Sequence, residues 1–419
     1  MRKTGFTPCV AALALAVSAT ACGSSSSSST GSGSASATAP SGGASSGGAT
    51  SGKPIEILDI TATSGATAVF GQQETNGLQA AASYYDAHGG ILGRQIKLTV
   101  VNDNSDPATA TSIATKELSS NPGKYAMVWA GEEGTVTAAL VPIMKRYKVF
   151  ATAVDDGNNA CAQASNCPNL FTQVGSNSLA EIADAAALKK EGATKVGIIA
   201  EQLTYDEAEL PFIQKDLARL GIKTVTVTFP PTAVSVTPEM SQLKADGVDA
   251  VFAEALGPAA GYVLGARAAL GWSVPTTFDI TGSSLDISKL APKSQLGGVT
   301  ETIHYCMNIK HDIPAFDLLL KYTPQPLNGS VTCPIAGDGW AGMVLLDEAA
   351  TKAQSLDTTA LSKAAETIKV TNQEANFPYI SYQAYCWSAS NHEQVCNSPS
   401  DFEVVPVGTL VNTRLHPLK

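Results

Sequence analysis

Acidic side chains are the residues of this sequence best placed to do chemistry. They stand where short apolar runs end, as two adjacent pairs and two single residues, and such positions point toward a ligand in many parallel-sheet proteins. A carboxylate there can accept hydrogen bonds from a bound solute. The acids are Glu132, Glu133, Asp155, Asp156, Glu254 and Asp279.

Aromatic and hydroxyl side chains lie in or beside the same segments. Phe70, Trp129 and Tyr205 offer flat faces for apolar or cation–π contact with a ligand. Each aromatic could equally be a core residue, although an apolar residue in a loop at the end of a strand favours a ligand contact. Thr281 adds a hydroxyl donor and acceptor. Together with the six acids, these four residues form the candidate ligand-binding set.

Three interpretations of the acids are open. Two carboxylates about 5–10 Å apart could hydrolyse a glycosidic bond, or the acids could bind a solute, or they could form a solvated face. No nucleophile, metal or cofactor motif accompanies them, so binding is favoured over catalysis. We expect no catalytic residue, no metal and no cofactor.

The elements that must position these residues begin after residue 52. Short apolar runs alternate with segments of helical periodicity, which predicts βαβ units and a parallel sheet. Asp106-Pro107 adds an N-cap residue before a proline at the first helical position. The expected strands of this first series are 55–60, 96–101, 125–129 and 149–153, and its expected helices are 71–88, 107–118 and 135–146.

A second series repeats the alternation. It predicts an α/β fold of two similar, doubly wound parallel-sheet lobes with a cleft between them. The second series has expected strands at 195–200, 222–229, 249–253 and 274–278, and helices at 178–191, 207–220, 237–246 and 259–270. The expected domains are an N-terminal lobe (53–175), a C-terminal lobe (176–300), helices returning mainly to the N-terminal lobe (301–375, with helices at 314–322, 340–353 and 358–368) and a disulfide-containing tail (376–419).

The N-terminus has the pattern of an exported lipoprotein. Residues 1–21 combine a positive head, an apolar run from Val10 to Val17 and small residues before Cys22, which is typical of a signal peptide. This cleavage site resembles the bacterial lipobox, whose cysteine is lipidated, although ordinary cleavage would leave Cys22 free. Residues 22–52 form a Ser/Gly-rich tether of low complexity. We expect a lipid-anchored protein on the extracytoplasmic face of the cell membrane.

Six further cysteines indicate disulfides. An even number in an exported chain favours three bridges, and 15 pairings are possible. Their grouping into three separated couples favours local pairing. A zinc site is the alternative, but no ligand spacing typical of zinc occurs. The favoured pairs are Cys161 with Cys167, Cys306 with Cys333, and Cys386 with Cys396.

Two further features exclude other classes of function. The formal charge of −10 over 419 residues disfavours nucleic-acid binding, which normally needs a basic patch. The glycines of residues 337–342 match G-x-G-x-x-G, but no convincing strand precedes them. We therefore interpret this segment as the glycine-rich entry to a helix.

Several motifs resemble the solute-binding proteins of ABC importers with the type I periplasmic-binding fold, in particular the branched-chain amino-acid-binding (leucine-binding) group. They are Ser64-Gly65, Phe70-Gly71, the run from His88 to Arg94, Asp106-Pro107 and Tyr205. The resemblance implies a monomer that captures a small-molecule ligand by hinge closure and delivers it to ABC permease subunits. It also places ligand-stacking aromatics at Phe70 and Tyr205.

The loops depart from that group where its members hold an amino acid. Acids stand at 132–133 and 155–156 in place of small hydroxyl residues, and they would repel an α-carboxylate. The sequence therefore favours an amine or a polyhydroxylated solute, with a small polar solute of the amino-acid family as the alternative, whose carboxylate would be held by backbone amides. A sensor that presents its ligand to a membrane receptor shares these features, and a cell-surface hydrolase remains the third hypothesis.

Overall fold

The computed structural model describes residues 52–157, 159–175, 179–202, 204–255, 257–280, 286–325, 331–374, 376–411 and 414–418, with the backbone alone for 204–209. The predicted signal peptide, Cys22 and the tether up to residue 51 lie outside the described residues, as does Thr281. Among the described residues, no helix combines the length and apolar character needed to cross a bilayer.

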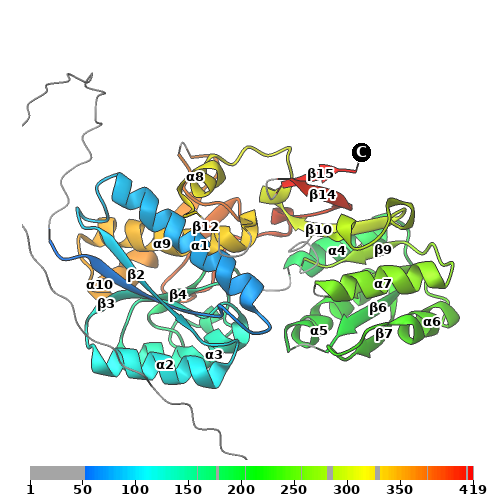
Figure 1. Cartoon of the computed structure of the whole chain (residues 1–419), viewed down its shortest axis with the longest axis horizontal. Helices are drawn as coiled ribbons and strands as arrows, with labels where there is room; N and C mark the ends of the chain where they lie inside the picture. Colours follow the sequence, from blue (N-terminus) through cyan, green and yellow to red (C-terminus); the bar gives the residue numbers. More distant parts are fainter. Residues whose placement is uncertain are drawn as a thin grey trace, which may run out of the picture. The chain divides into compact units, whose positions relative to one another are not determined.

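The first sheet is parallel throughout, with strand order β2-β1-β3-β4-β5. Figure 1 shows helices α2 and α3 on one face and α1 on the other. β5, a short strand that the sequence pattern did not predict, forms one edge. The elements are β1 (Ile55–Thr61), α1 (Ala68–Ala87), β2 (Ile96–Asn102), α2 (Pro107–Ser120), β3 (Tyr125–Ala130), α3 (Gly134–Tyr147), β4 (Ala151–Ala153) and β5 (Leu170–Thr172).

The second sheet has strand order β13-β10-β9-β8-β6-β7. Its strands are parallel except β13, which comes from the C-terminal segment and pairs antiparallel with β10. The two sheets with flanking helices confirm the predicted α/β fold class. The elements are α4 (Leu179–Lys190), β6 (Lys195–Glu201), α5 (Thr204–Arg219), β7 (Lys223–Phe229), α6 (Thr237–Ala245), β8 (Ala250–Glu254), α7 (Pro258–Ala269), β9 (Thr276–Phe278), β10 (Val299–His304) and β13 (Phe402–Pro406).

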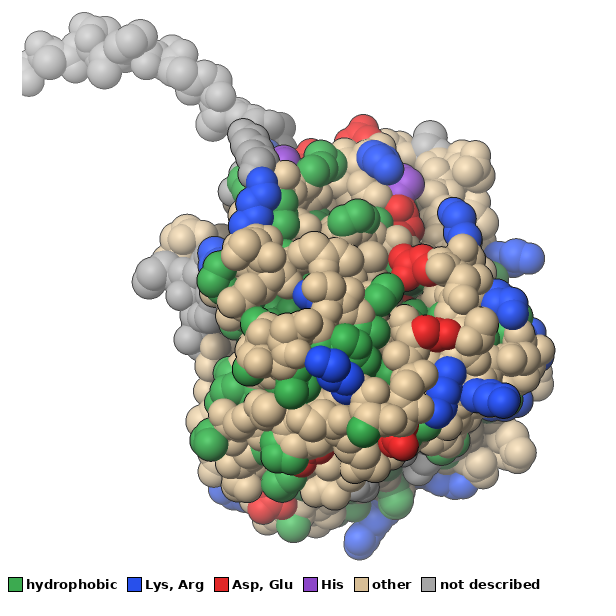
Figure 2. Space-filling model, turned by 90° about the vertical axis from the view of Figure 1, so that its right-hand side faces the viewer, with side chains coloured by type: hydrophobic (Ala, Val, Ile, Leu, Met, Phe, Trp, Pro, Cys, Tyr) green, Lys and Arg blue, Asp and Glu red, His purple; other side chains and the backbone are tan. Residues whose placement is uncertain are grey.

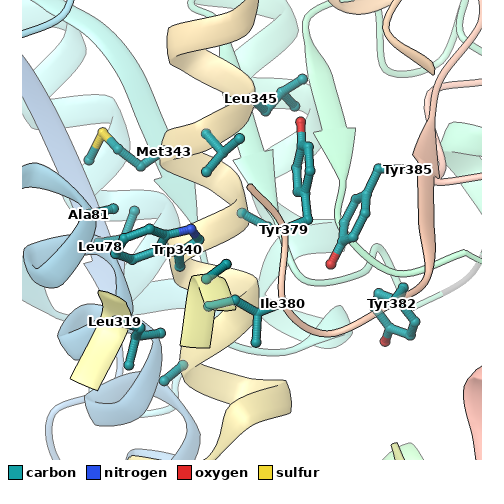
Figure 3. Packing of buried hydrophobic residues seen from close by; sticks show 14 of the residues in the cluster. Leu78, Ala81, Leu319, Trp340, Met343, Leu345, Tyr379, Ile380, Tyr382 and Tyr385 are labelled. Atoms are coloured by element: carbon teal, nitrogen blue, oxygen red, sulfur yellow. The ribbon is translucent and has the colours of Figure 1, made fainter. Parts of the chain in front are cut away.

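The chain after β10 returns to the first sheet. α8 (Pro314–Tyr322), α9 (Cys333–Ala353) and α10 (Thr358–Ala365) share one hydrophobic cluster with α1, β1 and β3. In Figure 3, Trp340 and Met343 of α9 point toward Leu78 and Ala81 of α1. The sequence predicted helices in this region, but α9 begins at Cys333, seven residues before the expected start.

The glycine-rich motif lies inside α9, so its interpretation as a helix entry was wrong. A Cβ at Gly339 would stand 2.1 Å from the carbonyl oxygen of Glu74 on α1. On the α1 side, a Cβ at Gly77 would stand 1.9 Å from the carbonyl oxygen of Ala336. Both glycines therefore allow the two helix backbones to approach more closely than any side chain would permit.

Three disulfides join the pairs favoured by the sequence, Cys161–Cys167, Cys306–Cys333 and Cys386–Cys396. The loop closed by the last pair covers the exposed edge of β5. The His392 carbonyl accepts a hydrogen bond from the backbone N–H of Thr172 at 3.0 Å, and the indole N–H of Trp387 donates to the Thr172 carbonyl at 2.8 Å. The loop thus satisfies backbone groups that an open sheet edge would expose. The remaining strands form two small antiparallel pairs, β11 (Lys369–Thr371) with β12 (Ala384–Cys386) and β14 (Gly408–Val411) with β15 (Arg414–Pro417).

We predict that Gly77→Ala destabilises the protein by about 1–3 kcal/mol, because the new methyl group overpacks the contact between α1 and α9. Gly265→Ala is the matched control, since Gly265 lies in α7 and a Cβ added there would meet only open space. The control should stabilise the protein by about 0.4–1 kcal/mol through reduced entropy of the unfolded chain. Urea unfolding measures both variants. Equal effects of the two substitutions would contradict the close helix contact.

Candidate functional site

The first three strands of the N-terminal sheet end at one edge, where their following loops are joined by side-chain hydrogen bonds. Glu132, after β3, accepts hydrogen bonds from the Ala62 N–H at 3.1 Å and from the Thr67 hydroxyl at 2.6 Å, both in the loop between β1 and α1. The Thr67 N–H donates to the hydroxyl of Ser105, after β2, at 3.0 Å. Loops separated by up to 70 residues in sequence therefore form one unit.

Glu132 is buried with a second acid, Asp103. Their exposed fractions are 3% and 0%. Burial is the main cause that raises the pKa of Glu132 to about 8; the Thr67 hydrogen bond opposes the shift and the Asp103 charge adds to it. Burial also raises the pKa of Asp103. Glu132 thus supports the loop from inside and does not present a free carboxylate to solvent.

Glu133 and Asp155 remain partly exposed at the same edge. Glu133 caps α3, accepting hydrogen bonds from the N–H groups of Thr135 at 2.8 Å and Val136 at 3.1 Å. Asp155 accepts a hydrogen bond from the Gly157 N–H at 2.7 Å, and burial raises its pKa to about 7. A Cβ at Gly134 would stand 2.2 Å from Asp155 Oδ1. The loops after β3 and β4 therefore lie against each other at this edge.

Asp156 has a structural role. It is 3% exposed, and its carboxylate accepts a hydrogen bond from the Cys161 N–H. One carboxylate oxygen of Asp156 and the sulfurs of Cys161 and Cys167 lie within 4.8 Å of one another. The two sulfurs form a disulfide and so cannot supply the thiolates that a zinc ion needs. Asp156 therefore holds the start of the disulfide loop.

The aromatic candidates differ in their placement. Trp129 is fully buried in the core cluster, and its indole N–H donates to Glu74 at 3.0 Å. The expectation that Trp129 presents a face to a ligand was wrong, because β3 is covered by helices on both faces. Phe70 is half-buried in the first turn of α1, next to the loop that Glu132 holds. Tyr205 lies in the first turn of α5, and its side chain is outside the described residues.

Acids also occupy the corresponding ends of the second sheet. Glu254 is the last residue of β8, and Asp279 directly follows β9; both are buried. The Asp279 N–H donates to the Ala253 carbonyl at 3.1 Å, which keeps the two strand ends together. In Figure 2, acids and cations on the face shown are interspersed with uncharged side chains.

Further acids, which the sequence analysis did not single out, are buried where α1 and α9 pack on the first sheet. Asp59, in the middle of β1, accepts a hydrogen bond from the Thr75 hydroxyl at 2.7 Å. Burial is the main cause that raises the pKa of Asp59 to about 7 and that of Asp338 to about 8, and it raises the pKa of Glu74 well above its usual range. Asp59 shares one face of β1 with the buried Ile55 and Ile57, and this period of two residues was the available signal.

A model of the periplasmic binding protein family matches residues 54–394. A periplasmic binding protein type 1 from Bordetella pertussis Tohama I is 20% identical, with a TM-score of 0.69 over 87% of this chain and 100% of its own. An extracellular ligand-binding receptor from Rhodopseudomonas palustris HaA2 is 18% identical, with a TM-score of 0.71 over 87% and 99%. A solute-binding protein of an ABC transporter from R. palustris, in complex with benzoate, is 19% identical, with a TM-score of 0.67 over 84% and 93%. No curated protein sequence matches the chain.

We predict that stability falls as pH rises from 5 to 8 and that Asp59→Asn reduces this fall. The native pKa of Asp59 is raised from 3.8 to about 7, so at pH 5 the folded state still holds a proton that the unfolded state has already released, and the folded state loses it before pH 8. The stabilisation is complete below about pH 4 and is lost as pH rises through 7. Asp59→Asn should reduce the difference between pH 5 and pH 8 by about 1–3 kcal/mol in urea unfolding.

The control for this measurement is Glu191→Gln, since Glu191 is exposed just after α4. Its difference between pH 5 and pH 8 should equal that of the wild type. A pH dependence unchanged in Asp59→Asn would contradict the burial of an ionisable carboxyl at this position.

Proposed function

Because the chain belongs to the periplasmic binding protein family, we propose that it is the solute-binding component of an ABC importer and captures a small polar solute by closing two lobes over it. The observation that carries this proposal is the family match over residues 54–394, which spans the parallel strands of both sheets. In open parallel sheets, ligands bind beyond the carboxyl ends of the strands. We propose that the protein binds and releases its solute without converting it chemically, as expected for a family that is defined by ligand binding.

The proposed ligand contacts come from the loops at those strand ends. On the N-terminal sheet they are the partly exposed Phe70, Glu133 and Asp155. Glu132 and Asp156 are buried and already accept hydrogen bonds, so they are supports for this site. On the second sheet the proposed contacts are Tyr205 and Thr281, whereas Glu254 and Asp279 are buried like Glu132 and are proposed as supports.

An amine or a polyhydroxylated solute fits these side chains best. Asp155 and Glu133 would accept its N–H or O–H groups, and Phe70 would contact its apolar or cationic part. The R. palustris relative in complex with benzoate binds a carboxylate. Because Glu132 is buried and holds its proton to about pH 8, it repels a carboxylate less than an exposed ion would. The charge on Asp155 therefore determines whether the site prefers an amine or polyhydroxylated solute or instead accepts a carboxylate.

The proposed setting is the outer face of the cell membrane. Three disulfides agree with an oxidising compartment. We propose that Cys22 carries the lipid anchor, that residues 22–52 are the tether, and that the protein acts as a monomer on ABC permease subunits. Two acyl chains on Cys22 would give stable membrane attachment, where a single chain gives only marginal binding.

We predict binding of an amine or a polyol in a calorimetry panel of amines, sugars, amino acids and benzoate. If the ligand is an amine, Asp155→Asn should weaken its affinity about tenfold, which corresponds to the loss of one charge-assisted hydrogen bond. Asp106→Asn is the matched control, because it removes the same charge from a neighbouring loop and asparagine also caps a helix. Sub-micromolar binding of leucine, isoleucine or valine would contradict the proposed solute class. Binding of none of the compounds would contradict the proposed function.

A further inference from the structure

One of the segments that join the two sheets runs from residue 305 to residue 313. It follows β10 of the second sheet and leads into α8, which packs in one hydrophobic cluster with α1 and β1 of the first sheet. When two lobes close by a hinge, the change in backbone angles is concentrated in a few residues of such segments. The contacts of residues 305–313 therefore determine how freely the lobes can move.

A disulfide attaches the start of this segment to the first lobe. Cys306, two residues after the end of β10, is bonded to Cys333, the first residue of α9. Thr332, directly before α9, is held in turn, because its N–H donates to the side-chain carbonyl oxygen of Gln73 on α1 at 2.7 Å. Gln73 and both cysteines are fully buried. The disulfide therefore keeps the end of β10 next to α9 in every arrangement of the lobes.

A turn in the middle of the segment is held by two side chains of the C-terminal strands. The turn runs from Asn308 to His311, whose N–H donates to the Asn308 carbonyl at 3.1 Å. Glu403, in β13, accepts a hydrogen bond from the Asn308 side-chain N–H at 2.7 Å, and its other oxygen lies 2.6 Å from His311 Nε2. Arg414, in β15, donates to the backbone carbonyls of Asn308 and His311. Glu403 therefore binds the side chains of both end residues, and Arg414 binds their backbone.

The C-terminal strands are themselves anchored on the second sheet. β13 pairs with β10 over residues 300–304. The N–H of Gly408, at the start of β14, donates to the buried side chain of Glu301 in β10 at 3.0 Å, and β14 pairs with β15. The turn at residues 308–311 is therefore attached to the second lobe, shortly after the cysteine that is attached to the first.

The segment is thus attached alternately to the two lobes. It leaves the second sheet at His304, meets α9 at Cys306, returns to the second sheet at residues 308–311 and enters the first lobe at Ile313, which is buried in the cluster around α1. Asp312, between the turn and Ile313, is exposed. A segment with these attachments does not act as a free linker, and rotation of the lobes is confined to the bonds near Cys306 and Asp312.

We propose that the Cys306–Cys333 disulfide, Glu403 and Arg414 form a brace across this connection, which fixes the pivot close to Cys306 and limits how far the ligand-free protein opens. The disulfide resists separation of β10 from α9. Glu403 and Arg414 hold the turn, because four contacts must break before it can extend. Without the brace, the residues of the segment would regain backbone conformations, and the lobes would sample a wider range of orientations.

The relevance of the brace to solute capture rests on the proposed function, whereas the brace itself does not. A narrow range of open states leaves less conformational entropy to lose when the lobes close on a solute. Loss of the brace would therefore weaken solute binding without removing any of the proposed ligand contacts.

The test is the distribution of distances between two nitroxide labels in the ligand-free, full-length protein, measured by double electron–electron resonance. The labels are attached to p-acetylphenylalanine in place of Ser112 on α2 and Gln242 on α6, so that no cysteine is modified. Both positions are exposed, and α2 and α6 pack in the hydrophobic clusters of different lobes. The width of this distribution reports the range of lobe orientations.

Two variants remove the brace from its two sides. Glu403→Ala combined with Arg414→Ala releases the turn, and Cys306→Ala combined with Cys333→Ala removes the covalent attachment. Each should widen the distribution about twofold relative to the wild type, because the freed residues regain backbone conformations. Circular dichroism checks that both variants fold. If the cysteine variant does not fold, the variant that releases the turn decides the test alone.

Glu366→Ala combined with Arg146→Ala is the matched control. Glu366 lies 3.3 Å from His392 Nε2, which is the same kind of pair, and Arg146 is exposed on α3. Within the described part of the chain, neither residue is found in a hydrogen bond with residues 305–313. The control should keep the wild-type width. A wild-type distribution as wide as that of the turn variant, or a control distribution that is equally wide, would overturn the brace. Because no ligand is present, this result is independent of whether the calorimetry panel finds a binder.

Discussion

Burial of carboxyl groups without cations is the physical constraint on which the N-terminal half of this protein depends. Asp59, Glu74, Asp103, Glu132 and Asp338 are all buried, and none of them forms a salt bridge within the described part of the chain. Hydrogen-bond donors and retained protons therefore offset the loss of water. Several of these donors join separate segments, as when Ala62 and Thr67 donate to Glu132. The hydrogen bonds that satisfy the buried carboxyl groups therefore also hold the loops in place.

The return of the chain to the first sheet completes this arrangement. The carbonyl oxygen of the Gln73 side chain accepts from the N–H of Thr332 at 2.7 Å, across 259 residues of sequence. Gly77 and Gly339 bring the backbones of α1 and α9 together, and the Cys306–Cys333 disulfide holds the start of α9. α1 thus packs on the sheet beside a later helix that covers the same face, so the loop before α1 ends on a rigid support.

Much of the fold could be predicted from the sequence, because strand alternation and helical periodicity depend on local patterns. The local cysteine pairs could be predicted for the same reason. β13 could not, since its partner β10 lies far earlier in the chain and its pairing is set by tertiary contacts. The predicted start of α9 was wrong because glycines usually indicate a turn. The neighbouring helix that requires glycine at these positions cannot be identified from the sequence.

The candidate site was predicted to the level of loops but not of individual side chains. Glu132 and Glu133 are adjacent, yet one points inward to Ala62 and the other caps α3. Trp129 and Phe70 are both aromatic residues near strand ends, yet Trp129 belongs to the core. Burial of a particular side chain depends on which helix covers it, and the sequence pattern does not contain that information.

A crystal structure with a solute bound is the most direct test of the role of Glu132. It would show whether this buried carboxyl group supports the loop between β1 and α1 without contacting the solute. We expect the solute against the exposed atoms of the loop between β1 and α1 and against Phe70, with both Glu132 oxygens still bonded to Ala62 and Thr67. A structure in which Glu132 turns out to contact the solute, or in which the solute lies away from this strand edge, would contradict that role.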